Sequence, residues 1–257
     1  MRRVRIIPVL LIDSAAGLVK TVKFGKRTYI GDPINAVRIF NDKGIDELIL
    51  LDIDATRDGR EPNYALIEDV ASEAFMPVGY GGGITSPAQI QRLLRCGLEK
   101  VVLSTAAHQN PELVRAAARE SGAQSVVVCI DLKRGLFGPR VVTRGDRSKT
   151  RLSPEQAASR AVEAGAGEII VQSVDRDGTF SGYDEPLLAS IARSVAVPVI
   201  ALGGARNIED FYAAVAGAGC SAAAAGSMFV FQGAARGILI SYPSESELDG
   251  LYRRLAA

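Results

Sequence analysis

PVGYGGGI (77–84) matches PVIALGGA (198–205) when the chain is shifted by 121 residues, the offset between positions 77 and 198. Self-similarity at one fixed offset indicates a duplicated structural unit. The same shift, without a gap, aligns LSTAA (103–107) with AAGSM (224–228) and DIDATRDG (52–59) with SVDRDGTF (173–180). The sequence therefore predicts two similar halves, each with an Asp-bearing, a glycine-rich and a small-residue segment.

Apolar runs of strand length alternate with amphipathic stretches such as 32–44, 86–97 and 153–165. The strand candidates are 5–11, 47–53, 76–82, 100–105, 125–131, 168–174, 198–204 and 222–227. Near-continuous apolar strands between helices favour a parallel sheet covered on both faces. Eight such units in 257 residues predict an α/β fold, a (βα)8 TIM barrel with a two-fold half-barrel repeat, as one domain over 1–257. The alternative is an open doubly wound sheet.

The composition excludes several classes of protein. The 30 basic and 29 acidic residues give a net charge of +1, which argues against nucleic-acid and membrane partners. Three cysteines without a CxxC pair suit reduced thiols, and the N-terminal apolar run is too short to span a membrane, so we expect a cytoplasmic protein. The single histidine, His108, leaves no metal spacing and no Cys–His pair, so we expect no metal, no cofactor and no glutamine hydrolysis by this chain.

The glycine-rich segments end predicted strands, where barrel enzymes build their active sites. Glycines without Cβ atoms allow a phosphate to approach the backbone N–H groups, and hydroxyl groups one strand later add donors. The first cradle consists of Gly82, Gly83, Ser104 and Thr105, and the second cradle of Gly203, Gly204, Gly226 and Ser227. Two cradles on opposite sides of one mouth predict an elongated ligand with a phosphate at each end, unless the small residues serve packing alone.

Acidic residues also stand at strand ends. Asp131 closes SVVVCID (125–131), and a carboxylate at the end of a buried strand usually serves the site. The alternative for Asp131 is a salt bridge to Lys133 or Lys20. Asp52 and Asp54 end the second predicted strand and are either functional acids or packing partners of Lys20.

The segment VDRDGTFSGYD (174–184) places Asp177, Gly178 and Thr179 in one tight loop. Asp177 and Thr179 have the chemistry to bind ligand hydroxyls. A structural Asx turn uses the same residue types, so the loop alone leaves both interpretations open.

Over essentially its whole length the chain resembles the HisF family, the cyclase subunits of imidazole glycerol phosphate synthase. The matching stretches are GDP (31–33), GIDELILLDI (44–53), GYGGGI (79–84), KVVLSTAA (100–107), SVVVCIDLKR (125–134), GAGEIIVQSVDRDGTFSGYD (165–184) and PVIALGGA (198–205). The resemblance implies a bis-phosphorylated aminoimidazole-carboxamide ribonucleotide as substrate. It also implies a separate HisH-like glutaminase at the N-terminal barrel face, whose ammonia travels through the barrel to a pair of catalytic aspartates.

Residue by residue, the resemblance makes Asp131 the acid of the fifth barrel strand and Lys20 the lysine of the first loop. It places phosphate ligands at Gly82, Gly83, Thr105, Asp177, Gly178, Gly204 and Ser227, with Ser104 where the family has Asn. It places a charged ammonia gate at the barrel base on Arg5, Glu47, Lys100 and Glu168. Burying four charges costs desolvation free energy, so a purely structural role is a weak explanation for these residues.

The chain departs from the family at the first strand. VLLIDSAAG (9–17) has Leu11 where the family has its catalytic aspartate, and one extra residue lengthens the turn. A leucine transfers no proton. Asp13 is the candidate substitute if the turn folds back, although it stands about 6.6 Å further along the strand. Leu202 also replaces a serine beside the second cradle.

Stretches such as GLVKTVKF (17–24) and LISYPS (239–244) resemble the WbuZ-type branch of the family, associated with surface-polysaccharide sugars. This resemblance implies that the barrel passes ammonia to a separate sugar amidotransferase that makes an acetamidino group. Two alternatives remain: a genuine cyclase of histidine biosynthesis, and a non-catalytic activator of the glutaminase.

Overall fold

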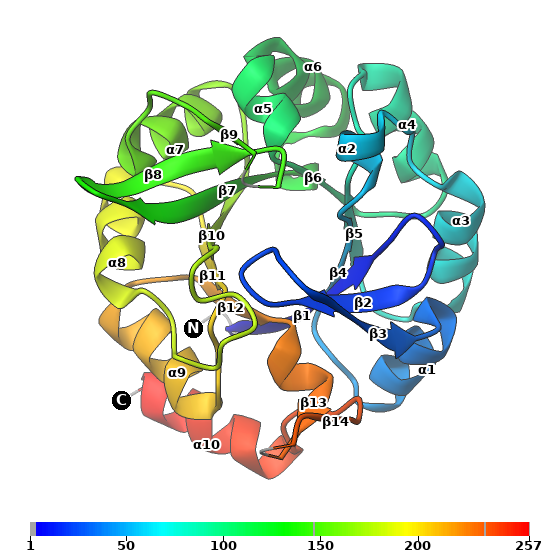
Figure 1. Ribbon diagram of the computed structural model, residues 1–257, viewed down its shortest axis with the longest axis vertical. Coiled ribbons are helices and arrows are strands. Elements are labelled where there is room, and N and C mark those ends of the chain that lie inside the picture. Colours follow the sequence, from blue (N-terminus) through cyan, green and yellow to red (C-terminus); the bar gives the residue numbers. More distant parts are fainter. Residues whose placement is uncertain (1–3, 146, 234, 257) are drawn as a thin grey trace.

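The computed structural model describes residues 4–145, 147–233 and 235–256. Parallel strands form a closed ring in the order β10-β11-β12-β1-β4-β5-β6-β7, and pairing of β7 with β10 completes it (Figure 1). These strands are β1 (Arg5–Ile12), β4 (Leu48–Asp52), β5 (Val78–Gly81), β6 (Lys100–Leu103), β7 (Val126–Gly135), β10 (Glu168–Ser173), β11 (Val199–Leu202) and β12 (Ala222–Ala225). The predicted (βα)8 barrel is confirmed, and the open sheet is wrong.

Helices cover the outside of this ring (Figure 1). The α-helices are α1 (Pro33–Asp42), α2 (Ala55–Asp58), α3 (Tyr64–Glu73), α4 (Pro87–Arg95), α5 (Thr105–Gln109), α6 (Pro111–Ser121), α7 (Pro154–Glu163), α8 (Glu185–Ser194), α9 (Ile208–Tyr212) and α10 (Glu245–Ala256). Short helical turns of other types are η1 (Ala123–Ser125), η2 (Ala213–Gly217) and η3 (Ser227–Phe229).

Side-chain alternation along the strands separates two apolar regions. In β1, Ile6, Leu10 and Ile12 pack toward the helices, whereas Ile7 and Leu11 face the barrel interior. Successive side chains of a strand point to opposite faces, and both faces of this sheet are buried. This double burial explains why the strands appear in the sequence as continuous apolar runs.

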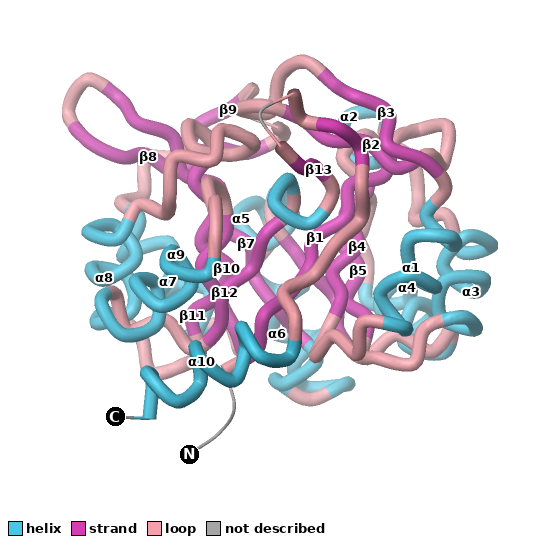
Figure 2. The backbone as a smooth tube through the Cα atoms, turned by 90° about the horizontal axis from the view of Figure 1, so that it is seen from below, coloured by secondary structure: helices cyan, strands magenta, loops and turns pink. Residues whose placement is uncertain are grey.

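Three antiparallel hairpins extend the loops beyond the ring, and the sequence patterns did not predict them. They pair β2 (Leu18–Thr21) with β3 (Arg27–Gly31), β8 (Gly138–Thr143) with β9 (Ser148–Lys149), and β13 (Phe231–Gln232) with β14 (Gly237–Ile238). The side view places them at the rim opposite the chain termini (Figure 2). The first two hairpins follow β1 and β7, and the 121-residue offset carries positions 5–12 onto 126–133 and 18–21 onto 139–142. The half-barrel repeat therefore includes these hairpins.

The helix after the first cradle begins at a well-defined cap. Ser86 accepts a hydrogen bond from the backbone N of Gln89 at 3.3 Å, and the Gln89 side chain accepts one from the backbone N of Ser86 at 3.1 Å. Such a capping box satisfies backbone donors that a helix end leaves free. It fixes where α4 begins relative to the glycines of the first cradle.

Replacing Ser86 with Ala is expected to lower the free energy of unfolding by about 1 kcal/mol, because the cap of α4 is lost. Urea unfolding followed by circular dichroism measures the change. Ser72→Ala in α3 is the control, since Ser72 is exposed and lies inside a helix. Equal effects of the two substitutions would contradict the stabilising role of this cap.

Candidate functional site

A cavity of about 240 Å³ opens among the carboxyl ends of the barrel strands. Strand ends of β1, β4, β5, β6, β7 and β10 contribute to its wall. Among the predicted site residues, those that line it are Asp52, Gly82, Gly83, Ser104, Thr105 and Asp131. The structure thus brings the first cradle and the acid of the fifth barrel strand, β7, into one cavity.

The glycines of the first cradle are required by close backbone packing. A Cβ at Gly82 would lie 2.4 Å from the carbonyl oxygen of Asp52, and one at Gly83 would lie 2.5 Å from that of Arg60. Both glycines also have positive φ, +122° and +70°, where other residues are strained. Gly82 and Gly83 hold the wall of the cavity against the loop that follows β4.

The second cradle has the same tight packing but a different surrounding. A Cβ at Gly204 would lie 2.2 Å from the carbonyl oxygen of Gly182, and one at Gly226 would lie 2.2 Å from Nζ of Lys20. Within the described part of the chain, no residue of the second cradle lines the cavity. This cavity therefore adjoins the first cradle and not the second.

Asp131, in β7, is one of two carboxylates of the described residues that line the cavity, together with Asp52. Its Oδ2 accepts a hydrogen bond from Oγ of Ser104 at 2.9 Å, and its Oδ1 accepts a longer one from Sγ of Cys129 at 3.5 Å. Burial raises the pKa of Cys129 well above its usual range, and the neighbouring Asp131 adds to this effect, so the thiol stays protonated. Leu11, 8% exposed, also lines the cavity at the end of β1.

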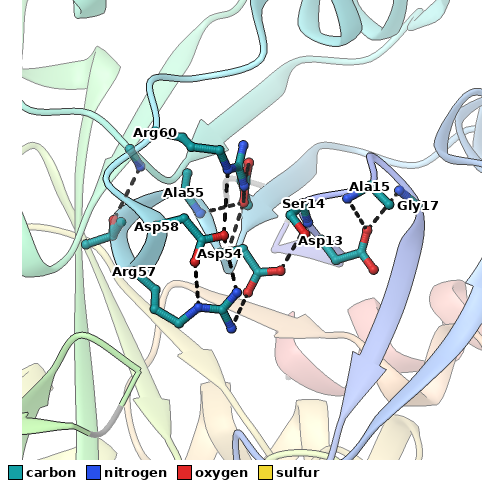
Figure 3. Close-up of polar contacts among 12 residues, drawn as sticks. Asp13, Ser14, Ala15, Gly17, Asp54, Ala55, Arg57, Asp58 and Arg60 are labelled. Atoms are coloured by element: carbon teal, nitrogen blue, oxygen red, sulfur yellow. Dashed lines mark hydrogen bonds and ion pairs between the residues drawn. The ribbon is translucent and has the colours of Figure 1, made fainter.

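Asp13 lies in the turn between β1 and β2. Its Oδ1 accepts hydrogen bonds from the backbone N of Ala15 at 3.0 Å and of Gly17 at 3.2 Å, as Figure 3 shows. Asp13 is not among the described residues that line the cavity. The extra residue of the turn thus folds Asp13 into an Asx turn instead of returning it to the place of the missing acid.

The two acids after β4 have partners in neighbouring loops. Asp54, fully buried, pairs with Arg27 of β3. It also pairs with Arg57 at 2.9 Å and accepts a hydrogen bond from the backbone N of Ser14 (Figure 3). The hydrogen bond from Arg27 lowers the pKa of Asp54 against the opposing effect of burial. The proposed packing of Asp54 against Lys20 is therefore wrong, and Asp54 ties the β2–β3 hairpin to this loop.

The Asp52 side chain binds the backbone where the short helix α2 begins. Its Oδ1 accepts hydrogen bonds from the backbone N of Asp54 at 3.0 Å and of Ala55 at 2.8 Å, and Arg60 pairs with it at 3.3 Å. Burial raises the pKa of Asp52, although these hydrogen bonds oppose the shift. These contacts hold the loop next to the first cradle in its conformation.

Lys20 is buried between β1 and the loop after β10. Its Nζ donates to the carbonyl oxygen of Val9, and its ammonium group interacts electrostatically with Asp177, whose Oδ2 accepts from Oγ1 of Thr21 at 3.1 Å. Burial lowers the pKa of Lys20 to about 8, although Asp177 opposes the shift. Thr179 donates from Oγ1 to the carbonyl oxygen of Arg176 at 2.7 Å, which favours the structural interpretation of this residue.

A second group of charges lies at the opposite end of the barrel, where the strands begin. Glu47 pairs with Arg5 and, at 3.0 Å, with Lys100. Glu168 pairs with Arg5 at 2.6 Å and with Lys100 at 2.8 Å. The four residues predicted as an ammonia gate thus form a closed ring of ion pairs, called the basal ring below. Each charge has two partners of opposite sign, which compensates for its burial.

Several residues of the cavity wall were not recognised from the sequence. Arg27 and Arg57 reach it from the loops after β1 and β4, and Arg144 and Arg147 reach it from the segment between β8 and β9. The basic run RGDRSK (144–149) was a usable signal for the last two. Gln172, at the end of β10, adds a further polar group.

The lowered pKa of Lys20 gives a pH dependence with a defined sign. Between about pH 8 and 10.5 the folded protein has released the Lys20 proton and the unfolded chain still binds it, so stability rises with pH. Relative to Lys20→Met, the free energy of unfolding is expected to increase by about 1.4 kcal/mol per pH unit across this window, and to show no such slope below it. Urea titrations between pH 7 and 10.5 measure the difference, with exposed Lys26→Met as the control. Parallel profiles of wild type and Lys20→Met would contradict the assignment.

Within residues 4–145, 147–233 and 235–256, every helix is too short or too polar to cross a membrane. The same residues contain no group of three or more His, Cys, Asp or Glu side chains placed to hold a metal ion.

Comparison with known proteins agrees with this geometry. A family model described as "Histidine biosynthesis protein" matches residues 5–235. "Putative imidazole glycerol phosphate synthase subunit hisF2" of Pseudomonas aeruginosa is 50% identical over 251 residues, covering 97% of this chain and 99% of the relative. A HisF protein with a similar printed name from Leptospira interrogans is 44% identical over 254 residues, covering 98% and 100%. "Imidazole glycerol phosphate synthase subunit HisF" of Lactiplantibacillus plantarum is 44% identical over 232 residues, covering 88% and 90%. The chain therefore belongs to the HisF family of histidine-biosynthesis barrel proteins.

Proposed function

We propose that this barrel receives ammonia at its base from a HisH-like glutaminase and conducts it to the mouth. Above the basal ring, the interior is lined by side chains such as Ile7, Ile49, Val127, Ile170 and Ala222, all buried. Uncharged ammonia crosses an apolar column at a far lower cost than an ion does. A ring of charges below such a column suits a gate that admits ammonia and holds back ions.

The observation that carries the assignment is Leu11 in the cavity wall. Ring closure, as the family resemblance implies it, needs two acids, and leucine has no proton to transfer. Asp13 is engaged in its own turn. We therefore propose that ammonia leaves the mouth for a separate sugar amidotransferase, in keeping with the resemblance to the WbuZ-type branch of surface-polysaccharide biosynthesis.

A second candidate is a genuine cyclase of histidine biosynthesis. Asp131, held by Ser104 beside the first cradle, favours this function, as do the printed names of the HisF relatives. In that case a water-mediated arrangement replaces the missing acid. A third candidate is a non-catalytic activator of the glutaminase. Like the first candidate it performs no ring closure, but it also transfers no ammonia.

Mixing the protein with its glutaminase, glutamine and the bis-phosphate ribonucleotide separates the first two candidates. We expect glutamine hydrolysis to be stimulated by the barrel and no ring-closure product to form, because Leu11 stands where the family resemblance implies the second catalytic acid. Chromatography of the ribonucleotide and its products checks this. Turnover that Asp131→Asn abolishes would contradict the proposal and establish the cyclase.

Opening the basal ring tests the passage of ammonia. Glu168→Ala leaves Arg5 and Lys100 each with one carboxylate partner instead of two. We expect glutamine hydrolysis to continue while the ammonia incorporated per glutamine falls by about tenfold, a change of about 1.4 kcal/mol, because the opened ring lets ammonia escape to solvent. Glutamate and amidated product are measured together.

The control for this experiment is Glu112→Ala, which removes an exposed carboxylate whose ion-pair partner is its helical neighbour Arg115. An unchanged ratio of product to glutamate in Glu168→Ala would contradict the gate. It would favour the third candidate, in which the barrel only activates the glutaminase.

A further inference from the structure

The hairpin formed by β7 and β8 ends in two exposed apolar side chains. Gly135 pairs with Gly138 at its end, so Leu136 and Phe137 are the two residues of the turn. Both side chains are essentially fully exposed, Leu136 at 97%. Figure 2 shows the hairpin, labelled at β8, projecting outward from the rim of the mouth. The turn therefore presents both side chains to a partner outside this chain.

The conformation of the turn does not explain these two residue types. Two-residue hairpin turns favour Asn, Asp and Gly. Under the 121-residue offset, Ala15 and Ala16 hold the equivalent positions in the turn after β1. The other half of the barrel thus forms the same turn with small side chains. Leucine and phenylalanine at this tip gain no burial within the chain, so they point to an interaction with another molecule.

Cations flank the apolar turn. Arg140 lies directly opposite Lys133 in the hairpin, although like charges in that position destabilise a strand pair. Arg134 and Arg140 are exposed, and neither guanidinium group forms an ion pair with a residue that the structure describes. Two large apolar side chains beside positive charge are complementary to an apolar pocket rimmed by carboxylates.

Exposed apolar side chains also occur on the other two hairpins of the mouth. Among the described residues, the large ones on these hairpins or directly after them are Val22, Tyr29, Ile238 and Leu239. Those at other places are Ile39 in α1 and Phe75 between α3 and β5. Exposed apolar groups gathered on one face are typical of a protein-interaction surface. The face concerned is the rim of the mouth.

The position of this rim indicates which partner it meets. The apolar column of the interior continues to the mouth, where Leu11 and Val102 line the cavity. Under the proposed function ammonia leaves the barrel here, and in open water it takes up a proton and ceases to be a nucleophile. An acceptor enzyme seated on the rim shields the ammonia from water. A membrane surface or a second copy of this chain would cover the exit without supplying an acceptor.

We propose that the turn of Leu136 and Phe137, with Arg134 and Arg140 beside it, docks the sugar amidotransferase on the mouth. The two apolar side chains enter a pocket of that enzyme, and the arginines meet carboxylates at the edge of the pocket. This inference rests on the proposed function, and it adds the surface through which the ammonia acceptor is held.

Sedimentation velocity of the barrel with the purified sugar amidotransferase of the same organism measures the docking. Leu136→Ala with Phe137→Ala copies the turn of the first half. It is expected to raise the Kd at least about tenfold, a change of about 1.4 kcal/mol, because apolar anchors carry much of the binding energy of an interface. Ile39→Ala with Phe75→Ala, both exposed away from the mouth, is the matched control and is expected to leave the Kd unchanged.

Reversing the charge beside the turn tests the acidic edge of the pocket. Arg134→Glu with Arg140→Glu is expected to raise the Kd at least about tenfold as well, and binding of the wild type is expected to weaken with added salt. Arg95→Glu with Arg119→Glu, both exposed on the outer helices α4 and α6, is the control for the change in net charge.

Amidation supported by glutamine tests what the docking does. With the glutaminase present and the proteins at limiting concentration, the double alanine variant of the turn is expected to form at least about tenfold less amidated product. Release of glutamate, and amidation supported by added ammonium chloride, are expected to stay unchanged. Unchanged glutamate release shows that the variant barrel is folded and still engages the glutaminase.

Absence of binding by the wild type, an unchanged Kd in the double alanine variant, or equal weakening by either control would overturn the proposal. Turn-dependent binding to vesicles of phosphatidylethanolamine and phosphatidylglycerol, or turn-dependent self-association of the barrel, would overturn it if the amidotransferase does not bind. The proposed function fails separately. Turn-dependent binding without glutamine-supported amidation contradicts the transfer of ammonia, whereas equal amidation by wild type and turn variant contradicts the docking alone.

Discussion

Closure of the sheet between β7 and β10 is the constraint on which the other features depend. The two strands pair in register from Val127 opposite Glu168 to Leu132 opposite Ser173. A closed parallel ring gathers every strand start at one rim and every strand end at the other. The basal ring and the first cradle are consequences of this geometry, because their residues lie far apart in the sequence and meet only when the ring closes.

The two ends of the barrel handle buried charge differently. At the base, two cations and two carboxylates pair alternately, so each charge is compensated inside the ring. At the mouth, single carboxylates compensate single cations of the hairpin after β1: Asp54 pairs with Arg27, and Asp177 interacts with Lys20. The base therefore holds one closed network of charges, whereas the mouth holds separate pairs carried by the loops.

How much of the structure can be predicted from the sequence depends on whether the interactions involved are local or long-range. The barrel strands and the helix beginning after Ser86 depend on local patterns, and these predictions were confirmed. The residues of the basal ring were identified by resemblance to the family. They lie close together because each stands where a barrel strand begins, and all strands begin at the same rim. The partners of Asp54 and Lys20 depend on how a loop folds across the mouth, and no local pattern encodes that. The Asx turn of Asp13 was a local signal, since Asp followed by small residues and Gly17 is typical of a turn.

The internal repeat explains why the mouth has two cradles, and the loops explain why they differ. Gly82 and Gly203 are counterparts under the 121-residue offset, and both press against the backbone of the preceding strand end. The barrel therefore supplies two equivalent places. The hairpin after β1 carries Lys20 into one of them, whereas the hairpin after β7 brings Arg144 to the rim of the other. Leu11 lies on the wall between these halves, at the position where the family resemblance implies an acid. Because the repeat fixes the strand ends in both halves, the loops decide how the two places differ.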